Sequence, residues 1–443
     1  MRISNISVVG LGKLGLCLAN VLASKGFSVI GVDTDASKIN QVNRGISPIF
    51  EPGLETLLQA HRARLSATVD YNQAIGNSDA TFVVVPTPSE PSGGFSLGYV
   101  EQAMGKIGEA LREKRGYHLI VLTSTVMPGS MEHLAPLLEE RSSKVCGRDF
   151  GLCYNPEFIA LGNVVRGLLR PDFVLIGESD ERAGQELAQI QSHVCENNPP
   201  IERMNFVNAE IAKISVNSFV TMKMSYANTL AEICENVVGA DVDRITTAIG
   251  KDKRIGSAYL KGALGYGGPC FPRDNIAFAS FAKGVGAQGD LALTTHQINE
   301  RQVKRITRIF VKENLHPPMK VGVLGLTYKP GTNVTEASQA LMLAQQLASE
   351  GFEIFVYDPA LTNDSLSRDG LRFKPTAEAC IEATDVCILA TPWEAFKKIN
   401  SSVFSDKFVI DCWRILNDDA VRNSSRYFPL GKSFNKKIPA ILA

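Results

Sequence analysis

Neither sign of charge is in excess in this sequence, because its 46 lysines and arginines balance 46 aspartates and glutamates. Without a net field, binding to nucleic acid or to an anionic membrane is not expected, although local sites can still bind small anions. Long apolar runs are absent too, since none reaches the about 18 residues that indicate a transmembrane helix. The apolar N-terminus is interrupted by Gly10, Gly12, Lys13, Gly15 and Asn20, and no clean small-residue cleavage site follows, so no signal peptide is expected.

The nine cysteines are odd in number and form no CxxC pair and no His/Cys cluster with zinc spacing. Dispersed cysteines of this kind are typical of reduced thiols, so the sequence predicts a cytoplasmic protein without a metal site. Its 443 residues are too many for a single core. Two or three domains are therefore expected.

The N-terminal segment has the pattern of a dinucleotide-binding unit. Residues 5–10 are predicted to form a strand, a GxGxxG turn at 10–15 opens a helix to Ser24, and a second strand ends at Asp33. The glycines admit a pyrophosphate to the helix N-terminus, and Asp33 accepts hydrogen bonds from ribose hydroxyls while repelling a 2′-phosphate. We therefore predict NAD as the cofactor, bound by Gly10, Gly12, Lys13, Leu14, Gly15 and Asp33. Lys38 is placed beside the adenosine, although a solvated position is commoner for a surface lysine.

Further strands are predicted at residues 80–86 and 118–125, each ending in Pro, Ser or Thr. Strands that alternate with helical segments form a parallel, doubly wound sheet, whose carboxyl edge faces the cofactor. This edge places Pro86, Thr87 and Thr125 in the predicted cofactor site. Glu157 follows another short strand, where a site role and an ordinary surface position are both open.

Residues 205–238 contain little Gly or Pro and repeat apolar residues at helical spacing, which predicts one long helix between two domains. Lys213 and Asn217 are four residues apart and share one face of that helix. A lysine and an amide arranged in this way can bind water or an oxyanion. Taken alone, the pair is explained more simply by a solvated face.

Residues 262–275, GALGYGGPCFPRDN, place a cysteine after closely spaced glycines. Backbone can approach a small ligand where side chains are missing, as at Gly265, Gly267 and Gly268. Pro269 stiffens the chain before Cys270. A lone cysteine is usually a small buried hydrophobe, but packing does not explain the glycines and prolines around this one. With Arg273 and Asp274 setting the local charge, we predict a nucleophilic thiolate at Cys270.

The pattern of the N-terminus returns between residues 319 and 392, where strand, helix, strand and strand follow one another. The last of these strands mirrors residues 77–88. A second Rossmann-like domain is therefore predicted, but only Gly322 and Gly325 remain of the glycine fingerprint, which argues against a second dinucleotide site. Two cations of this region are available for phosphates, Lys329 and Arg414. The expected fold class is α/β, with two Rossmann-like doubly wound domains joined by a long central helix.

Along essentially its whole length, the chain resembles the nucleotide-sugar 6-dehydrogenases, the UDP-glucose and GDP-mannose dehydrogenase family. The matching motifs occur in order: GLGKLG with Asp33, EPGL at 51–54, VPTP at 85–88, STV at 124–126, NPEF at 155–158, AEIAKISVNSF at 209–219, GYGGPCFPRD at 265–274, GLTYKP at 325–330 and YDP at 357–359. The resemblance implies a four-electron oxidation of a sugar C6 alcohol to a carboxylate with two NAD, and a UDP-sugar is the favoured substrate.

The resemblance also implies roles for individual residues. Cys270 resembles the thiol that captures the aldehyde as a thiohemiacetal, which becomes a thioester. The family residues that stabilise the developing oxyanion and manage a catalytic water are resembled here by Lys213, Asn217 and Asp274. The family pair implicated in proton transfer and in hydrolysis of the thioester is resembled by Glu157 and Thr125. Arg273 is assigned to the cofactor. The expected substrate contacts are Phe158, Ile159, Lys213, Asn217, Arg254, Tyr259, Lys261, Gly265, Gly267, Gly268 and Lys329.

The implied domains are an NAD-binding domain at residues 1–204, a central helical and dimerisation domain with the cysteine loop at 205–315, and a nucleotide-sugar-binding domain at 316–443. Arg254 resembles an arginine that reaches the substrate from a partner subunit. A homodimer or higher homo-oligomer built on the central helix is therefore expected.

The chain departs from the family pattern at two positions near the cofactor, where Leu161 replaces a glutamate and Thr335 an arginine. Milder departures are Pro269 for serine, Arg273 for lysine and a one-residue shift of the late D-x-R arginine to Arg414. Three alternatives remain: a GDP-mannose or UDP-N-acetylhexosamine 6-dehydrogenase, a two-electron 6-phosphogluconate-like hydroxyacid dehydrogenase, and a weakly active nucleotide-binding homologue. The hydroxyacid dehydrogenases need no thiol, so Cys270 argues against the second.

Overall fold

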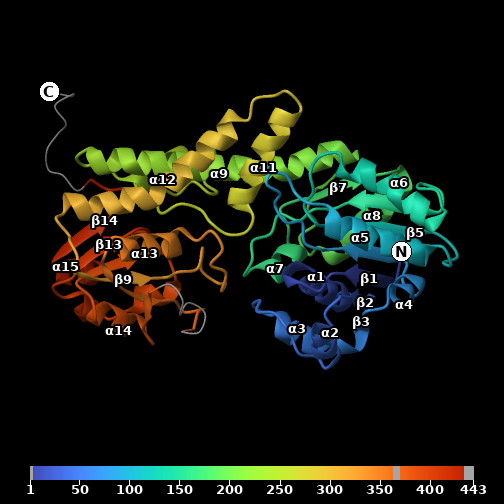
Figure 1. Cartoon of the computed structure of the whole chain (residues 1–443), viewed down its shortest axis with the longest axis horizontal. Coiled ribbons are helices and arrows are strands. Elements are labelled where there is room, and N and C mark those ends of the chain that lie inside the picture. Colours follow the sequence, from blue (N-terminus) through green and yellow to red (C-terminus); the bar gives the residue numbers. More distant parts are fainter. Residues whose placement is uncertain (1–2, 363–369, 434–443) are drawn as a thin grey trace. The chain divides into compact units, whose positions relative to one another are not determined.

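The computed structural model describes residues 3–362 and 370–433. The chain divides into two compact units, Met1–Ser215 and Val216–Ala443. Each unit contains one sheet with helices packed on its faces, coloured blue to green in the first unit and green through yellow to red in the second (Figure 1). The predicted fold class is confirmed.

The sheet of the first unit has eight strands in the order β3-β2-β1-β4-β5-β6-β7-β8. Their bounds are β1 Asn5–Val9, β2 Ser28–Val32, β3 Leu65–Thr68, β4 Ala80–Val83, β5 His118–Leu122, β6 Phe150–Tyr154, β7 Val174–Glu178 and β8 Ile201–Met204. Neighbouring strands are parallel except β6 and β7, which pair antiparallel. The last two strands therefore run against the other six, which the sequence pattern did not predict.

The helices of the first unit are α1 Lys13–Ser24, α2 Ala36–Asn43, α3 Leu54–His61, α4 Tyr71–Gly76, α5 Gly98–Leu111, α6 Ser130–Ser142, α7 Val164–Leu169 and α8 Glu181–Val194, with a short 3-10 turn at Arg62–Arg64. Strands β4, β5 and β6 are buried throughout, because apolar clusters cover both faces of the sheet. The predicted strands at 80–86 and 118–125 end earlier, at Val83 and Leu122. Pro86, Thr87 and Thr125 consequently lie in loops beyond the carboxyl edge of the sheet.

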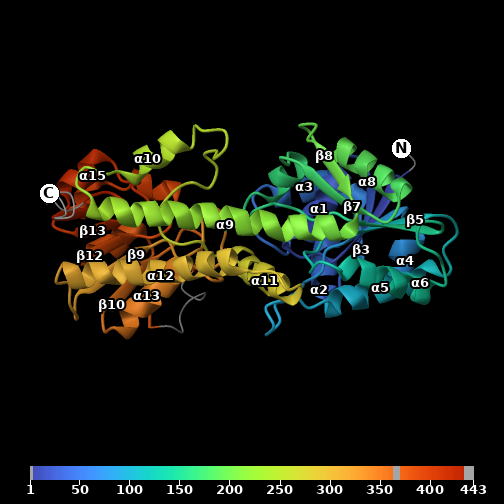
Figure 2. The ribbon, with the colours of Figure 1, turned by 90° about the horizontal axis from the view of Figure 1, so that it is seen from above.

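One long helix, α9, extends over Phe206–Asn236, close to the predicted limits of 205 and 238. Figure 2 shows it as a continuous green helix. Lys213 and Asn217 both lie on it, four residues apart, as predicted. The boundary between the two units falls between them, after Ser215.

The sheet of the second unit is parallel throughout, in the order β11-β10-β9-β12-β13-β14 among the residues described. Its strands are β9 Lys320–Leu324, β10 Glu353–Tyr357, β11 Arg372–Phe373, β12 Val386–Leu389, β13 Phe408–Asp411 and β14 Arg426–Pro429. The helices are α10 Val242–Ile249, α11 Phe271–Gly284, α12 Asp290–Lys312, α13 Gln339–Ser349, α14 Ala377–Glu382 and α15 Asp418–Asn423, with 3-10 turns at Glu394–Lys398 and Ser401–Phe404.

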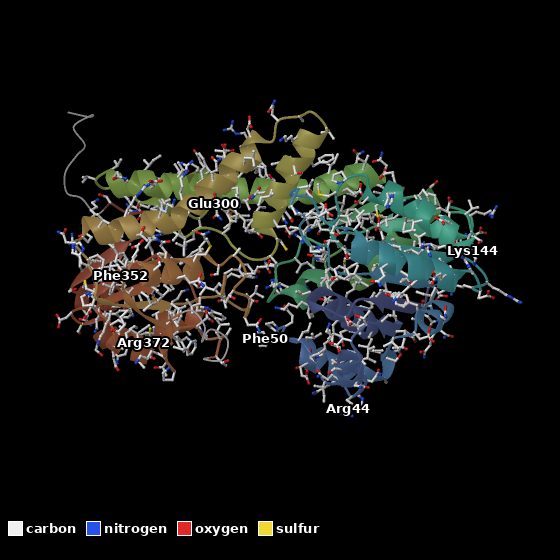
Figure 3. The ribbon with its side chains drawn as sticks, in the orientation of Figure 1. Arg44, Phe50, Lys144, Glu300, Phe352 and Arg372 are labelled. Carbon is white, nitrogen blue, oxygen red and sulfur yellow. The ribbon has the colours of Figure 1, made fainter. Side chains whose placement is uncertain are left out.

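Helix α12 connects α9 to this sheet. Figures 1 and 2 both show α12 beside α9, and Arg305 on α12 forms a buried ion pair with Glu235 on α9. On its other side, Phe310 packs edge-on against Phe352, labelled in Figure 3, with ring centroids 5.2 Å apart. The second sheet and the end of α9 therefore belong to one packed body. Within the described part of the chain, no helix combines the length and apolar character needed to cross a membrane.

Candidate active site

The glycines of the turn between β1 and α1 have three different surroundings. A Cβ on Gly10, whose φ is +95°, would lie 2.2 Å from the carbonyl oxygen of Val84, and one on Gly15 would lie 1.9 Å from that of Gly10. At Gly12 nothing lies within 4 Å. Gly12 is also the N-cap of α1 and brings no capping side chain, and no acid lies in the first turn. Tight packing at the outer two glycines and open space at the middle one fit the pyrophosphate of NAD.

Asp33 follows β2 directly, where the ribose of a dinucleotide is expected. One carboxylate oxygen accepts the N–H of Leu11 at 2.8 Å and the other that of Asp35 at 2.9 Å. Each oxygen retains a further lone pair for a ribose hydroxyl. The ammonium of Lys38 lies 3.6 Å from the same carboxylate, so this lysine is an ion-pair partner of Asp33.

The loops after β4 and β5 are joined by Ser124, which the sequence reasoning did not single out. Its hydroxyl accepts the N–H of Val85 at 2.9 Å and donates to the carbonyl of Val85 at 2.7 Å. This double contact holds the segments of Pro86, Thr87 and Thr125 next to one another. Thr87 is buried and Thr125 half-buried.

Lys213 and the segment after β6 meet within the first unit. The ammonium of Lys213 donates to the backbone carbonyl of Glu157 and lies 4.7 Å from the ring centroid of Phe158. Lys213 is only 4% exposed. The carboxylate of Glu157 accepts the N–H of Ile159. The structure therefore brings the predicted residues Glu157, Phe158, Ile159 and Lys213 together, with the lysine bound to main chain.

A second carboxylate on α9, Glu210, was missed by the sequence reasoning. It is fully buried and accepts the N–H groups of Gly129 at 2.7 Å and Met131 at 2.8 Å, at the start of α6. Burial, assisted by nearby Glu132, raises the pKa of Glu210 to about 7, against the opposing effect of the two backbone donors. The signal in the sequence was an acid inside an apolar helical stretch, one turn before Lys213.

We expect Glu210 to make folding stability fall as the pH rises from about 4.5 to about 7. In that window the buried carboxyl keeps its proton in the folded state while the unfolded chain has lost it, because the pKa rises on folding to about 7. Relative to Glu210→Gln, the wild-type free energy of unfolding should decline by about 3 kcal/mol across the window. Urea unfolding followed by circular dichroism at several pH values measures this difference. Glu140→Gln, an exposed acid on α6, should leave the pH dependence unchanged, whereas parallel curves for wild type and Glu210→Gln would contradict the prediction.

Cys270 caps the N-terminus of α11 and is exposed. Its carbonyl accepts the N–H of Asp274 at 2.8 Å. Asp274 is buried, and its carboxylate accepts the side-chain amide of Asn217 at 2.6 Å and the Nε of Arg273 at 3.4 Å. A helix N-terminus favours negative charge, as a thiolate nucleophile requires. Four predicted residues, Asn217, Cys270, Arg273 and Asp274, therefore gather within the second unit.

The glycines before Cys270 are required by close packing of the chain itself, whereas the sequence predicted that they let backbone approach a ligand. A Cβ on Gly265 would lie 2.4 Å from Oδ1 of Asn299, and one on Gly267 would lie 2.3 Å from the carbonyl oxygen of Ala337. Gly268 has φ +85° and faces the ring of Tyr328. The chain itself thus fills the space that the missing side chains leave.

The other predicted substrate residues of the second unit lie at or near its surface. Arg254 and Lys261 are exposed, and Arg254 pairs with Asp252 at 2.6 Å. Tyr259 is 52% exposed and adopts a φ of +59°, with its ring 6.3 Å from that of Phe271. The ammonium of Lys329 lies 6.0 Å from the ring centroid of Tyr328.

Arg414 is not available for a phosphate, contrary to the prediction. Its side chain is 4% exposed. The guanidinium binds both carboxylate oxygens of Asp243, at 2.6 and 3.0 Å, and the carbonyls of Gly262 and Leu430. Arg414 therefore has a structural role: it connects α10 and the start of the cysteine loop to the end of the second sheet. This role goes with its shift by one residue from the family's D-x-R spacing.

The departure at Leu161 is accommodated by packing. Leu161 is half-buried and packs against the apolar cluster that contains α1. The next residues are held by Glu51 of the EPGL motif, whose carboxylate accepts the N–H groups of Gly162 at 2.9 Å and Val164 at 2.8 Å. The loop is thus anchored by an acid other than the one that Leu161 replaces.

A glycine turn with open space at its middle glycine and an acid after the second strand define a dinucleotide-binding protein. Its second unit carries an exposed thiol at a helix N-terminus. Comparison with known proteins agrees. Residues 4–195 match the NAD binding domain, 207–301 the central domain and 322–418 the UDP binding domain of one family. The chain belongs to the UDP-glucose/GDP-mannose dehydrogenase family. The predictions of family, of enzyme class and of NAD as cofactor are confirmed.

Similar proteins include UDP-glucose 6-dehydrogenase AglM of Haloferax volcanii, which is 35% identical over 93% of this chain and 97% of its own length. GDP-mannose 6-dehydrogenase of Pseudomonas aeruginosa is 36% identical over 80% of each chain. Among solved structures, a UDP-glucose dehydrogenase from the hyperthermophilic archaeon Pyrobaculum islandicum superposes with a TM-score of 0.89, at 30% identity over 98% of both chains.

Proposed function

We propose that this enzyme oxidises a UDP-sugar at C6 to the uronic acid, in a four-electron reaction that passes through a covalent intermediate on Cys270. The observation that carries the proposal is the exposed thiol of Cys270 at the N-terminus of α11, one turn from a buried Asp274 that binds Asn217. A two-electron dehydrogenase has no use for such a thiol, whereas an aldehyde that must be oxidised again has to be retained.

NAD held by the glycine turn at Gly10, Gly12 and Gly15 and by Asp33 would supply the hydride acceptor for both oxidations at C6. After the first, the thiolate of Cys270 adds to the aldehyde carbon, and the oxygen takes up negative charge that Lys213 and Asn217 stabilise. After the second, the same carbon is a thioester. Water then adds to that carbon, with Asp274, Glu157 and Thr125 proposed to hold it and move its proton, and the C–S bond breaks to release carboxylate and thiol.

Of the proposed catalytic residues, three belong to the first unit, Glu157, Thr125 and Lys213, and three to the second, Asn217, Asp274 and Cys270. For the domains we propose residues 1–204, 205–315 and 316–443, supported by the three family models at 4–195, 207–301 and 322–418. A cytoplasmic location is proposed because the nine cysteines, all free in this structure, suit a reducing compartment.

A homodimer through α9 is proposed as well. Phe219, Tyr226 and Ile233 follow one another at seven-residue spacing on this helix and are 53–60% exposed. Large apolar residues at heptad spacing form a stripe that a second helix of the same kind can cover. Sedimentation of the wild type against Tyr226→Glu tests the proposal, since a wild-type monomer would contradict it.

A UDP-sugar is favoured over a GDP-sugar because a UDP binding domain model matches residues 322–418 and a relative named UDP-glucose 6-dehydrogenase aligns over 93% of the chain. GDP-mannose remains the second candidate, since the Pseudomonas aeruginosa enzyme of that name is 36% identical. We expect a panel of UDP- and GDP-sugars to give turnover with a UDP-hexose and two NADH per sugar, measured by NADH absorbance and product mass. One NADH per sugar would indicate a two-electron enzyme, and none with any sugar would indicate a binding homologue.

A further inference from the structure

Next to the Asp274–Asn217 contact lies a second polar contact between α11 and α9. The side-chain amide of Asn275 donates to Oγ1 of Thr221 at 2.8 Å. Thr221 is one helical turn beyond Asn217 on α9, and Asn275 follows Asp274 directly on α11. The two hydrogen bonds therefore join the first turn of α11, the cysteine helix, to one face of α9 at positions one turn apart.

Asn275 also binds one group of the glycine-rich segment before α11 and one of the first residue of α11. Its amide donates to the hydroxyl of Tyr266 at 3.0 Å and to the carbonyl of Phe271 at 3.3 Å. Tyr266 is held in turn by Asn299 of α12, whose carboxamide accepts the N–H of Tyr266 at 2.8 Å and donates to its carbonyl at 2.9 Å. Asn275 thus connects α9, α11 and the glycine-rich segment on either side of Cys270.

All members of this network are buried: Asn275 is 1% exposed, Thr221 0%, Tyr266 3% and Asn299 3%. In such surroundings a hydrogen-bonded amide fixes geometry, because any displacement leaves a buried polar group unpaired. Apolar contacts tolerate small shifts of one helix along another much better, since they have no required direction. The network therefore restrains the position and rotation of the first turn of α11, and with it the sulfur of Cys270.

We propose that Asn275, with Thr221 and Tyr266 as its partners, is a positioning residue for Cys270 and Asp274. This inference rests on the proposed function of Cys270 as the nucleophile. The role is separate from that of Asn217, which binds Asp274 itself. Asn275 acts on the reaction through the placement of the cysteine helix.

The test separates positioning from stability. Asn275→Leu alone should both destabilise the protein and slow turnover, because the hydroxyls of Thr221 and Tyr266 lose their partner. Combining it with Thr221→Val and Tyr266→Phe replaces the amide and both hydroxyls that it binds by apolar groups of similar shape, which is expected to restore stability. We expect kcat of this triple variant to stay about tenfold or more below wild type, with the NAD Kd within about twofold, because a shift of the order of 1 Å at the reacting sulfur is costly.

Reactivity of the thiol gives a readout that does not depend on the sugar. The iodoacetamide alkylation rate of Cys270, taken as the difference from a Cys270→Ser background, should change by several-fold in the triple variant. The matched control is Thr246→Val on α10, another buried threonine whose hydroxyl binds the carbonyl four residues earlier, as that of Thr221 does. This control should leave kcat and alkylation unchanged.

Wild-type kcat and alkylation in a triple variant of restored stability would overturn the positioning role. If the triple variant does not fold, Thr221→Val alone decides: lower kcat with an unchanged melting temperature supports the role, and unchanged kcat contradicts it. Failure of the proposed function looks different, because Cys270→Ser would then turn over like wild type in the same assays.

Discussion

Cys270→Ser is expected to lose net oxidation by about a thousandfold or more while still binding the sugar nucleotide and NAD. A serine hydroxyl at the N-terminus of α11 is nearly isosteric with the thiol but is a far weaker nucleophile, so the aldehyde is not captured for the second oxidation. Turnover is measured by NADH formation and binding by calorimetry. The two readouts together separate lost chemistry from lost binding.

The control for this variant is Cys146→Ser, because Cys146 is the other cysteine that is not buried in the described part of the chain. Cys146 lies in the first unit just before β6, and its N–H binds the carboxylate of Glu139, which is not assigned to the site. Its replacement should leave turnover unchanged. Wild-type rates in Cys270→Ser would exclude the covalent route.

The second large effect is expected at the glycine turn of the NAD site, where two alanine substitutions should fail in opposite ways. Gly15→Ala should prevent folding or lower stability severely, because its Cβ would lie 1.9 Å from the backbone oxygen of Gly10 and neither group can move freely. Gly12→Ala should fold normally, since nothing lies within 4 Å of its Cβ position. It should nevertheless weaken NAD by about tenfold or more, because the new methyl group enters the space of the pyrophosphate.

Thermal melting by circular dichroism and NAD titration distinguish these outcomes. Gly105→Ala on α5 is the matched control, since its Cβ position is also open and the residue lies on a helix that does not contain the turn. This control should not lower the melting temperature and should leave the NAD affinity unchanged. A stable Gly15→Ala variant, or a Gly12→Ala variant with normal NAD affinity, would contradict the assignment of the turn.

Much of the first half of the fold follows from local patterns. The strand, glycine turn, helix and second strand from residue 5 to Asp33 are specified by short-range periodicity and by glycines that backbone geometry requires, so they were predictable. Helix α9 was predictable for the same reason. The reversed direction of strands β7 and β8 was not predictable. It results from the pairing of β7 with β6, and no signal within the residues of the two strands indicates it.

The site residues divide in the same way. Cys270 stands out in the sequence because glycines and prolines surround it. Glu210 and Asn275 do not, because the partners of Glu210 on α6 lie 79–81 residues away along the chain and the partner of Asn275 on α9, Thr221, lies 54 residues away. Only folding shows which backbone or hydroxyl groups they meet. Arg414 shows the converse: the motif suggested a phosphate ligand, while tertiary contacts with Asp243 and Gly262 bury its charge.

By itself, the sequence determined the α/β class, the dinucleotide turn with Asp33, the long helix and the candidate nucleophile, since each depends on residues close together in the chain. Only the tertiary structure decided how those residues are held. The glycines before Cys270 pack against Asn299, Tyr328 and Ala337, and the cysteine helix is pinned to α9 by Asp274 and Asn275. Hydrogen bonds and close contacts between distant segments are directional and short-ranged, so no pattern along the chain specifies them before the chain has folded.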